Sequence, residues 1–389
     1  MFALLAPGQG AQKPGFLTPW LELPSIANRL RWWSAVTELD LLELGTTADA
    51  ETIRDTAVAQ PLLVAAGLAV AAELLDGPAR GAVTAGHSVG EFAAAVIAGS
   101  LSPEAALVLV RERGRAMAAA SALTPTGMSA VLGGEPAEVS AALAELELTA
   151  ANANGSGQVV AAGALDALAR LAANPPARAR VRPLSVAGAF HTCYMASARD
   201  ALATLAPGIP ARDPRMTMVS NADGSVVSSG PDLVARLVAQ VAAPVRWDLC
   251  MQTLDDLGVN AVIELPPAGT LTGLAKRALP GVETLALTSP ADLPAARSLI
   301  ATHPAPSVTE HAPAWRLVVA PLGGTFRREP VAAGDVLDSG AALGVIGNNR
   351  SEQKVEATHG GTLVEWLAED GDPITAGQPL ARLHPTAAH

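Results

Sequence analysis

The sequence predicts an α/β protein built on a parallel sheet, with an α+β insert and a small all-β module after it. Residues 1–125 alternate short apolar runs with longer Ala- and Leu-rich stretches of helical character. From Gly127 the order changes to β-α-β-β-α-β, and after residue 314 turn-forming residues recur every ~8–12 positions. Half of the 389 residues are hydrophobic, and a chain of this length is expected to form roughly two or three domains.

The order of the elements sets the expected domain boundaries. The first part of the large subdomain covers residues 1–126, where ARGAVTAGHSVGEFAAAVIAGSL predicts a strand, a sharp glycine turn and a helix. Residues 127–190 predict a ferredoxin-like small subdomain, and residues 191–290 return to the alternating pattern. The segment 291–313 is rich in Pro, Ala, Ser and Thr and is interpreted as a linker that is helical in part. Residues 314–389 form the all-β module.

Composition excludes several classes of function. The net charge of -11 argues against nucleic-acid binding, which requires a basic surface. The apolar start MFALLAP lacks a basic leader and predicts a first strand. No membrane span is predicted, because the long apolar stretches are Ala-rich and interrupted by Gly, Pro or Glu. Cys193 and Cys250 show neither metal-ligand spacing nor a disulfide framework, so we expect no metal site and a cytoplasmic protein.

The strongest single motif is G-x-S-x-G at residues 86–90, GHSVG. Glycines on both sides of Ser88 allow a strand to turn sharply into a helix, which exposes the serine hydroxyl in strained geometry near a helix N-terminus. The backbone N–H of Val89 is then placed to stabilise a tetrahedral oxyanion. The alternative is a tight structural turn, but the preceding AVTA strand and the following EFAAAVIAG helix favour a nucleophile.

A serine nucleophile requires a base, and His191 is the best candidate. The other histidines lie in the elbow itself, in the linker or in the C-terminal module. His191 follows LSVAGAF, interpreted as an apolar strand and a small-residue turn. The alternative is a core histidine. No carboxylate partner is evident, and a backbone carbonyl could equally orient the imidazole.

Seven motifs in order resemble those of malonyl-CoA:acyl carrier protein transacylases and the related acyltransferase domains of polyketide synthases. They cover roughly residues 1–290 and include GHSVGE and GAFH. The full set is GQGAQ at 8–12, GHSVGE at 86–91, RGRAM at 113–117, ANANGSGQVVAAG at 151–163, GAFH at 188–191, AQVAAPVRW at 239–247 and ELPPAGTLTGLAKR at 264–277. The resemblance implies an α/β-hydrolase-like core for the parallel sheet.

The resemblance also implies roles for individual residues. Ser88 would be the nucleophile and His191 the base, and Gln9 and Val89 would donate backbone N–H groups to the oxyanion. Arg113 would bind the free malonyl carboxylate, because a planar guanidinium matches a planar carboxylate. The alternative for Arg113 is an ordinary exposed helix charge.

Four further residues complete the implied site. The backbone carbonyl of Gln240 would orient His191, while Asn154 and Met117 would line the cavity. Asn154 could instead be a turn-former. Phe190 would crowd the α-carbon of the acyl group and disfavour methylmalonyl, and its alternative is a core side chain.

The function that follows is transfer of a malonyl group from malonyl-CoA to the phosphopantetheine thiol of an acyl carrier protein. It would proceed by a ping-pong mechanism through a malonyl ester on Ser88, without a cofactor, for fatty acid or polyketide synthesis. Two alternatives stay open: a serine thioesterase or esterase, and a non-catalytic scaffold. The acidic carrier would need a basic patch, formed either by Arg178, Arg180 and Arg182 or by Lys276 and Arg277.

The C-terminal module, residues 315–385, resembles the biotinyl/lipoyl carrier domain, a barrel-sandwich of two similar halves. Alignment of VEA at 355–357 places Arg350 at the position of the modified lysine. A guanidinium stays protonated and cannot form the amide. No biotin or lipoyl attachment is therefore expected, and the module would serve docking, oligomerisation or stability. The competing interpretation is modification of Lys354, the only lysine in the module.

Overall fold

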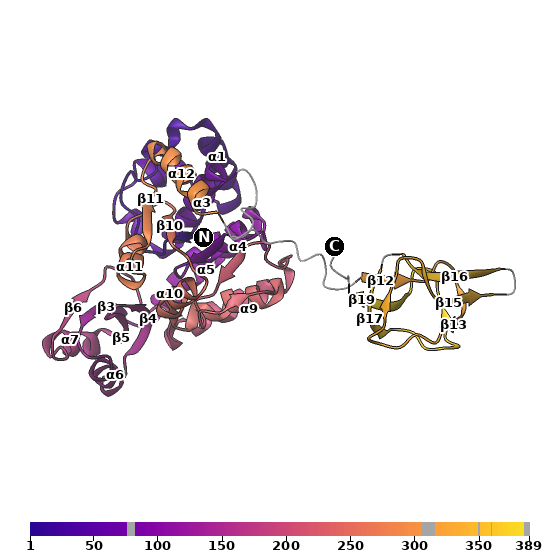
Figure 1. Cartoon of the computed structure of the whole chain (residues 1–389). Coiled ribbons are helices and arrows are strands. Elements are labelled where there is room, and N and C mark those ends of the chain that lie inside the picture. Colours follow the sequence, from indigo (N-terminus) through magenta and orange to yellow (C-terminus); the bar gives the residue numbers. More distant parts are fainter. Residues whose placement is uncertain (76–81, 305–315, 349–350, 359, 385–389) are drawn as a thin grey trace. The chain divides into compact units, whose positions relative to one another are not determined.

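The computed structural model describes residues 1–75, 82–304, 316–348, 351–358 and 360–384. The chain forms two compact units, Met1–Ser307 and Val308–His389 (Figure 1). The first unit combines a parallel sheet, surrounding helices and an inserted second sheet, and the second contains strands and loops.

A six-stranded sheet forms the centre of the first unit, in the order β11-β10-β1-β2-β7-β8. Its strands are β1 (Phe2–Ala6), β2 (Val83–Gly86), β7 (Thr217–Val219), β8 (Val226–Val227), β10 (Ala261–Glu264) and β11 (Glu283–Ala286). All neighbours pair in parallel except β8, which runs antiparallel to β7. The mixed α/β prediction with a parallel sheet is confirmed.

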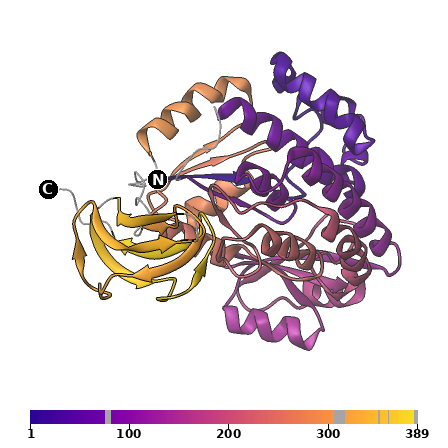
Figure 2. The same ribbon diagram turned by 90° about the vertical axis from the view of Figure 1, so that its right-hand side faces the viewer.

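Helices cover both faces of this sheet (Figures 1 and 2). They are α1 (Pro24–Thr37), α2 (Leu41–Thr46), α3 (Thr56–Leu74), α4 (Gly90–Ile97), α5 (Pro103–Ser121), α8 (Ala196–Leu205), α9 (Gly230–Ala239), α10 (Trp247–Asp256), α11 (Thr270–Ala278) and α12 (Leu293–Thr302). Short 3-10 turns are η1 (Thr18–Glu22), η2 (Thr52–Arg54), η3 (Cys193–Met195), η4 (Ala206–Gly208), η5 (Gln240–Ala242) and η6 (Pro290–Asp292).

Side chains that alternate along β1 divide the core into two clusters, as expected for a strand buried on both faces. Phe2 and Leu4 belong to the cluster that contains α3, α4 and α5. Ala3 and Leu5 belong to the cluster that contains α10 and α11. Three residues of the site described below, Val89, Met117 and Phe190, belong to the first of these clusters.

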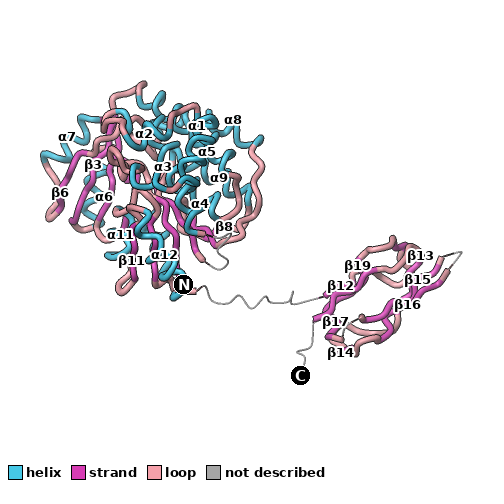
Figure 3. The backbone as a smooth tube through the Cα atoms, turned by 90° about the horizontal axis from the view of Figure 1, so that it is seen from above, coloured by secondary structure: helices cyan, strands magenta, loops and turns pink. Residues whose placement is uncertain are grey.

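The insert has the element order β-α-β-β-α-β predicted from the sequence. Its elements are β3 (Thr126–Gly133), α6 (Pro136–Glu145), β4 (Thr149–Gly155), β5 (Gln158–Ala164), α7 (Leu165–Ala173) and β6 (Ala179–Pro183). The sheet order is β6-β3-β5-β4, and β9 (Val245–Arg246) extends it by pairing in parallel with β4. Helices α6 and α7 pack on it through Val139, Leu143 and Leu171 (Figure 3).

The segment interpreted as a linker contains helix α12. Leu293, Ala296 and Leu299 of this helix are buried in the main core of the first unit. The segment was expected to be helical in part, and three apolar side chains at helical spacing attach that helical part to the core. Residues 305–313 of the predicted linker lie outside the described residues.

The second unit contains two four-stranded antiparallel sheets, β12-β19-β17-β14 and β16-β15-β13-β18 (Figure 3). The strands are β12 (Arg316–Val319), β13 (Gly324–Arg328), β14 (Val336–Leu337), β15 (Ala341–Gly347), β16 (Glu352–Ala357), β17 (Gly361–Trp366), β18 (Pro373–Ile374) and β19 (Pro379–His384). One apolar cluster, which includes Phe326, Ile346, Leu363 and Leu380, joins both sheets. The prediction of a small all-β module is confirmed.

Among the described residues, one helix has the length and hydropathy of a membrane span. This is α3, with 19 residues, and 78% of its apolar window is buried inside the protein. A buried core helix has the same composition as a membrane span, and α3 packs against α5, α1 and α4.

Candidate active site

Ser88 lies at the corner between β2, which ends at Gly86, and α4, which begins at Gly90. Its φ of 53° lies in the left-handed region that non-glycine residues rarely adopt. A Cβ atom at Gly86 would lie 2.0 Å from the carbonyl carbon of Gly90, and one at Gly90 would lie 2.2 Å from the carbonyl oxygen of Ala6. Only glycine fits at these two positions, so the sequence motif forms the sharp turn predicted for a nucleophile.

His191 is in direct contact with this serine. The Ser88 Oγ atom lies 2.7 Å from His191 Nε2, and His191 Nδ1 lies 2.7 Å from the backbone carbonyl oxygen of Gln240. Because the carbonyl can only accept, Nδ1 carries the proton and Nε2 is free to take the one from Ser88. Burial, and then the charge of Arg113, lower the pKa of His191 to about 3, so the imidazole is neutral.

The route of the chain to His191 differs from the prediction. Strand β6 ends at Pro183, and residues 184–187 have no strand structure. Leu184 is 38% exposed, although Ala189 and Phe190 are buried. The apolar letters of LSVAGAF therefore belong to a loop that descends into the core, and His191 has a left-handed φ of 62°.

Arg113 on α5 is only 1% exposed, so its interpretation as an exposed helix charge is wrong. Its Nη1 donates to Gln60 Oε1 at 2.6 Å, its Nη2 donates to Gln240 Oε1 at 2.9 Å, and Nη2 lies 3.5 Å from Ser88 Oγ. Burial lowers its pKa to about 10, which leaves the guanidinium charged at neutral pH. The two amide partners are neutral, and the buried Nε has no hydrogen-bond partner among the described residues. A buried cation held in this way is suited to bind an anion.

Three buried residues of the site were not identified from the sequence: Gln60, which lines the cavity and accepts from Arg113, and Glu91 and Asn221, which lie behind the elbow. Asn221 Oδ1 accepts from the Ser88 backbone N–H at 2.7 Å, and its amide donates to the Gly86 carbonyl at 2.7 Å. Glu91 accepts the Asn221 backbone N–H at 2.7 Å. Glu91 is the last residue of the GHSVGE motif, so its position next to the elbow could have identified it as part of the site. No local pattern distinguished Gln60 or Asn221.

A cavity of about 350 Å³ opens in front of Ser88. The predicted site residues that line it are Ser88, His191, Gln9, Val89, Arg113, Asn154, Phe190 and Met117. Gln240, the remaining predicted residue, does not line the cavity but forms hydrogen bonds with both Arg113 and His191. The structure thus brings all the predicted site residues to one place.

The GQG turn and strand β4 close the cavity beside the elbow. A Cβ atom on Gly8 would lie 2.7 Å from the His87 carbonyl oxygen, so this turn can approach the elbow only with glycine. Asn154 lies within β4, not in a turn, and its Oδ1 is 2.9 Å from His87 Nε2. The turn-former interpretation of Asn154 is therefore wrong.

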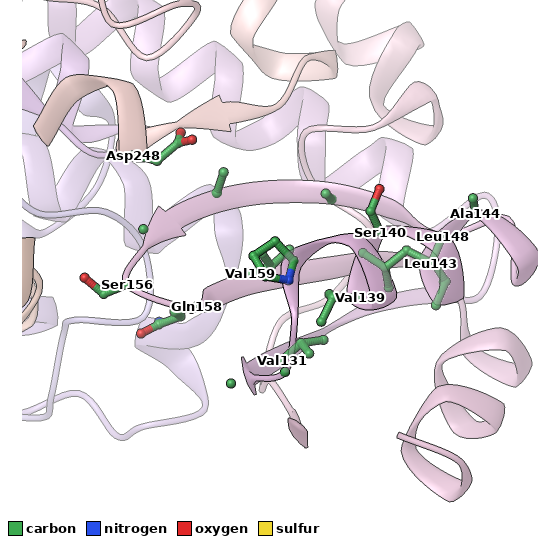
Figure 4. A pocket seen from close by; sticks show the side chains of 17 residues that line it. Val131, Val139, Ser140, Leu143, Ala144, Leu148, Ser156, Gln158, Val159 and Asp248 are labelled. Atoms are coloured by element: carbon green, nitrogen blue, oxygen red, sulfur yellow. The ribbon is translucent and has the colours of Figure 1, made fainter. Parts of the chain in front are cut away.

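A second cavity, of about 460 Å³, lies between the inserted sheet and α6 (Figure 4). Its lining residues on β3 and β5 alternate with those of the first cavity, which places it on the opposite face of that sheet. Val131, Val139, Leu143, Leu148 and Val159 give it an aliphatic wall. It contains no histidine, cysteine or cation among its lining residues. Among the described residues, no group of three or more His, Cys, Asp or Glu side chains is placed to hold a metal ion.

A serine on a strained strand-to-helix turn, a neutral histidine on its hydroxyl and a buried arginine in the same cavity define a serine acyltransferase or hydrolase with an anionic acyl substrate. Comparisons with known proteins narrow the class. Residues 5–292 match the family model of the acyl transferase domain. The chain belongs to the acyl transferase domain family.

Relatives in this family are malonyl CoA-acyl carrier protein transacylases. The protein of that name from Mycobacterium tuberculosis is 54% identical over 298 residues, which span 75% of this chain and 98% of the relative. The one from Escherichia coli is 32% identical over 306 residues, 77% of this chain and 99% of the relative.

Solved structures agree. The crystal structure of MCAT from Mycobacterium tuberculosis matches with a TM-score of 0.74 and 53% identity, over 76% of this chain and 99% of that chain. A complex of a type II PKS acyl-carrier protein with its malonyl-transacylase matches with a TM-score of 0.71 and 31% identity, over 76% and 99% of the two chains. The C-terminal module lies beyond the residues 5–292 that the family model covers.

Proposed function

We propose that this protein transfers a malonyl group from malonyl-CoA to the phosphopantetheine thiol of an acyl carrier protein, through an ester on Ser88. The observation that carries the proposal is the meeting of Ser88, His191 and the buried Arg113 guanidinium at one cavity. The enzyme is an acyltransferase of fatty acid or polyketide biosynthesis, and its partners are malonyl-CoA and the carrier protein.

The first half-reaction acylates Ser88. His191 Nε2 takes the hydroxyl proton as Oγ attacks the thioester carbonyl, and the backbone N–H groups of Gln9 and Val89 stabilise the resulting oxyanion. The C–S bond then breaks, and the coenzyme A sulfur leaves with the proton from His191. Arg113 binds the free carboxylate throughout. In the second half-reaction the carrier thiol attacks the Ser88 ester and the same steps run in reverse.

The carbonyl of Gln240 performs the orienting role that an acid performs in a Ser-His-Asp triad. It fixes the tautomer of His191 without adding a negative charge. The imidazolium formed during transfer then lacks a carboxylate partner and lies near the charge of Arg113. The malonyl carboxylate supplies the missing negative charge, so the correct substrate itself supports proton uptake by His191.

Acylation followed by a chase tests the proposal. The protein is incubated with malonyl-CoA, the acylated residue is located by mass spectrometry, and an acyl carrier protein thiol is then added. We expect a malonyl adduct on Ser88 that disappears as the malonyl carrier forms. Rapid loss of the adduct to water without a carrier would instead identify a thioesterase or esterase, and absence of any adduct would favour a scaffold.

Phe190 is proposed to select malonyl over methylmalonyl. Its ring is 5% exposed and lines the cavity next to His191, where an α-methyl group would meet it. We expect poor loading of Ser88 by methylmalonyl-CoA. Comparable loading by both thioesters would contradict this role.

We propose that the carrier docks on a basic surface beside the cavity. Arg180 and Arg182 are exposed and alternate along β6, an edge strand of the inserted sheet, and exposed Arg178 precedes them. Lys276 and Arg277 lie in the last turn of α11. Charge reversal one residue at a time should raise KM for the carrier but not for malonyl-CoA, and an unchanged carrier KM would refute that residue's part.

The finer domain organisation is also a proposal. The β6-β3-β5-β4 order supports a ferredoxin-like subdomain at 127–190, inserted in an α/β-hydrolase-like core at 1–126 and 191–290. Residues 314–389 would be a barrel-sandwich of the biotinyl/lipoyl type, supported by two antiparallel sheets around one core. The absence of a disulfide framework in the sequence supports a cytoplasmic location.

We propose that this module takes no prosthetic group. Lys354, though exposed, lies inside β16, where it pairs with Val345 and not at a hairpin tip. Arg350, at the aligned lysine position, lies outside the described residues. Intact-mass measurement should give the mass of the unmodified chain, and an added biotinyl or lipoyl mass would overturn the proposal.

A further inference from the structure

Glu91 is a buried carboxylate directly behind the nucleophile. It lies in the first turn of α4 and is 1% exposed. One carboxylate oxygen accepts the Asn221 backbone N–H, and the other accepts a hydrogen bond from the side-chain amide of Gln240. The mechanism above does not use this residue, which does not line the substrate cavity.

The contacts of Gln240 show what Glu91 can control. The Gln240 Nε2 group donates to Glu91 and lies 3.1 Å from the Ser88 carbonyl oxygen, while its Oε1 accepts from Arg113 Nη2 at 2.9 Å. A primary amide has one donor end and one acceptor end. The groups around the Nε2 end of Gln240 therefore determine whether its oxygen or its nitrogen faces Arg113.

We propose that Glu91 is a positioning residue for the malonyl carboxylate: it fixes the side-chain amide of Gln240, which in turn holds Arg113 beside Ser88. The Gln240 Nε2 group also donates to two neutral oxygens, the Ser88 carbonyl at 3.1 Å and Asn221 Oδ1 at 3.3 Å, and Glu91 is its charged acceptor. Without the charge at residue 91, the two neutral oxygens hold the amide less firmly, and it becomes free to rotate by 180° and present N–H groups to Arg113, which has only donors. Arg113 would then lose one of its two amide acceptors and its fixed orientation. This inference rests on the proposed malonyl transfer.

The substitution Glu91→Gln tests the idea because it preserves shape and removes one acceptor. The side chain then has one oxygen for two donors, Asn221 N–H and Gln240 Nε2. We expect kcat/KM for loading of Ser88 by malonyl-CoA to fall roughly tenfold, the value of one hydrogen bond to a charged group. Acetylation of Ser88 by 4-nitrophenyl acetate, which has no carboxylate for Arg113 to bind, should change far less. Equal loss with both acyl donors, or no loss with either, would overturn the proposal.

A double-mutant cycle tests whether Glu91 affects malonyl loading through Arg113. In the Arg113→Ala background, Glu91→Gln should have no further effect on malonyl loading. An undiminished effect there would show that Glu91 acts without Arg113 and would refute the inference. If E91Q does not fold, Glu91→Asp provides the same test, because its shorter side chain keeps the charge but cannot reach both Asn221 and Gln240.

Glu264→Gln provides a matched control. Glu264 is also a fully buried glutamate, but it accepts the backbone N–H groups of Gly269, Leu271 and Thr272. This variant should lose stability without changing the ratio of malonyl to acetyl loading, and an equal change in that ratio would refute a specific role for Glu91. Failure of wild-type protein to load malonyl would refute the proposed function instead.

Discussion

Two cavities lie on opposite faces of the inserted sheet, and only one of them is lined by the nucleophile, the base and the buried arginine. The larger, of about 460 Å³, is lined by Val131 and Val159 on strands β3 and β5. The smaller, of about 350 Å³, is lined by Met128, Ala130 and Val160 of the same strands. Strand alternation assigns neighbours to different cavities. The inserted sheet therefore contributes apolar side chains to the walls of both cavities. The two differ because residues of the elbow, of α5 and His191 line only the smaller one.

The largest effect is expected from removal of the nucleophile. Ser88→Ala should reduce transfer by at least ~10⁴-fold, because the covalent route is lost and only binding and oxyanion stabilisation are left. The control is Ser185→Ala, which removes another serine that lines the same cavity. Single-turnover loading followed by mass spectrometry measures both. Residual malonylation of the Ser88→Ala protein at another site would break the comparison.

Removal of the buried cation should have the next largest effect. Arg113→Ala should lower kcat/KM for malonyl-CoA by ~10²–10³-fold, because two charge-assisted hydrogen bonds to the carboxylate are lost. Acetyl transfer should be affected much less, so the preference of the enzyme for malonyl over acetyl donors should decrease. Arg115→Ala is the control, since that exposed neighbour pairs with Glu38 and Glu112 on the surface. Similar losses in both variants would indicate a helix defect.

A change of pH should alter kcat/KM for malonyl-CoA by a smaller factor than the removal of Arg113. Burial raises the pKa of Glu91 to about 7, although its hydrogen bonds and Arg113 oppose the shift, and the pKa of His191 is about 3. As pH falls through about 7, Glu91 gains a proton and ceases to be a pure acceptor for Gln240. Above that pH it is ionised and the acceptor is restored. The other titratable neighbours are Arg113 and Cys250; burial raises the pKa of the Cys250 thiol, so it stays neutral.

We therefore expect malonyl kcat/KM to decline on the acid side of about pH 7, while acetylation by an uncharged ester stays flat there. His191 stays neutral over that range, so it cannot cause the decline. The Glu91→Gln variant should abolish the acid limb. Persistence of the limb in that variant would assign it to another group.

The sequence predicted the residues that react and, through the family resemblance, the carbonyl of Gln240 that orients His191, but it did not predict Gln60 or Asn221. Ser88 was identified by its G-x-S-x-G motif, His191 was the best candidate base among the histidines, and the role of Arg113 came from the family resemblance. Alternating strand and helix patterns predicted the parallel sheet. Asn221 and Gln60 were missed because each reaches the site only through folding: Asn221 bonds to Ser88 across 133 positions and Gln60 to Arg113 across 53. The helical part of the segment 291–313 was expected, but the burial of α12 was not, since its three buried side chains contact elements distant in sequence.

The smallest effect on transfer is expected from the aliphatic cavity. Leu143 on α6 is 3% exposed and lines that cavity from the helix side. Leu143→Ala should lower the free energy of unfolding by about 2 kcal/mol, at the low end of the range for such truncations because the existing cavity already deprives Leu143 of some contacts. Transfer should stay within about twofold of wild type, because the sheet separates Leu143 from Ser88 and distant sites act independently. Denaturant unfolding and malonyl loading measure the two quantities. A tenfold loss of transfer in a folded variant would show that the inserted sheet couples its two faces, and the aliphatic cavity would then belong to the catalytic apparatus.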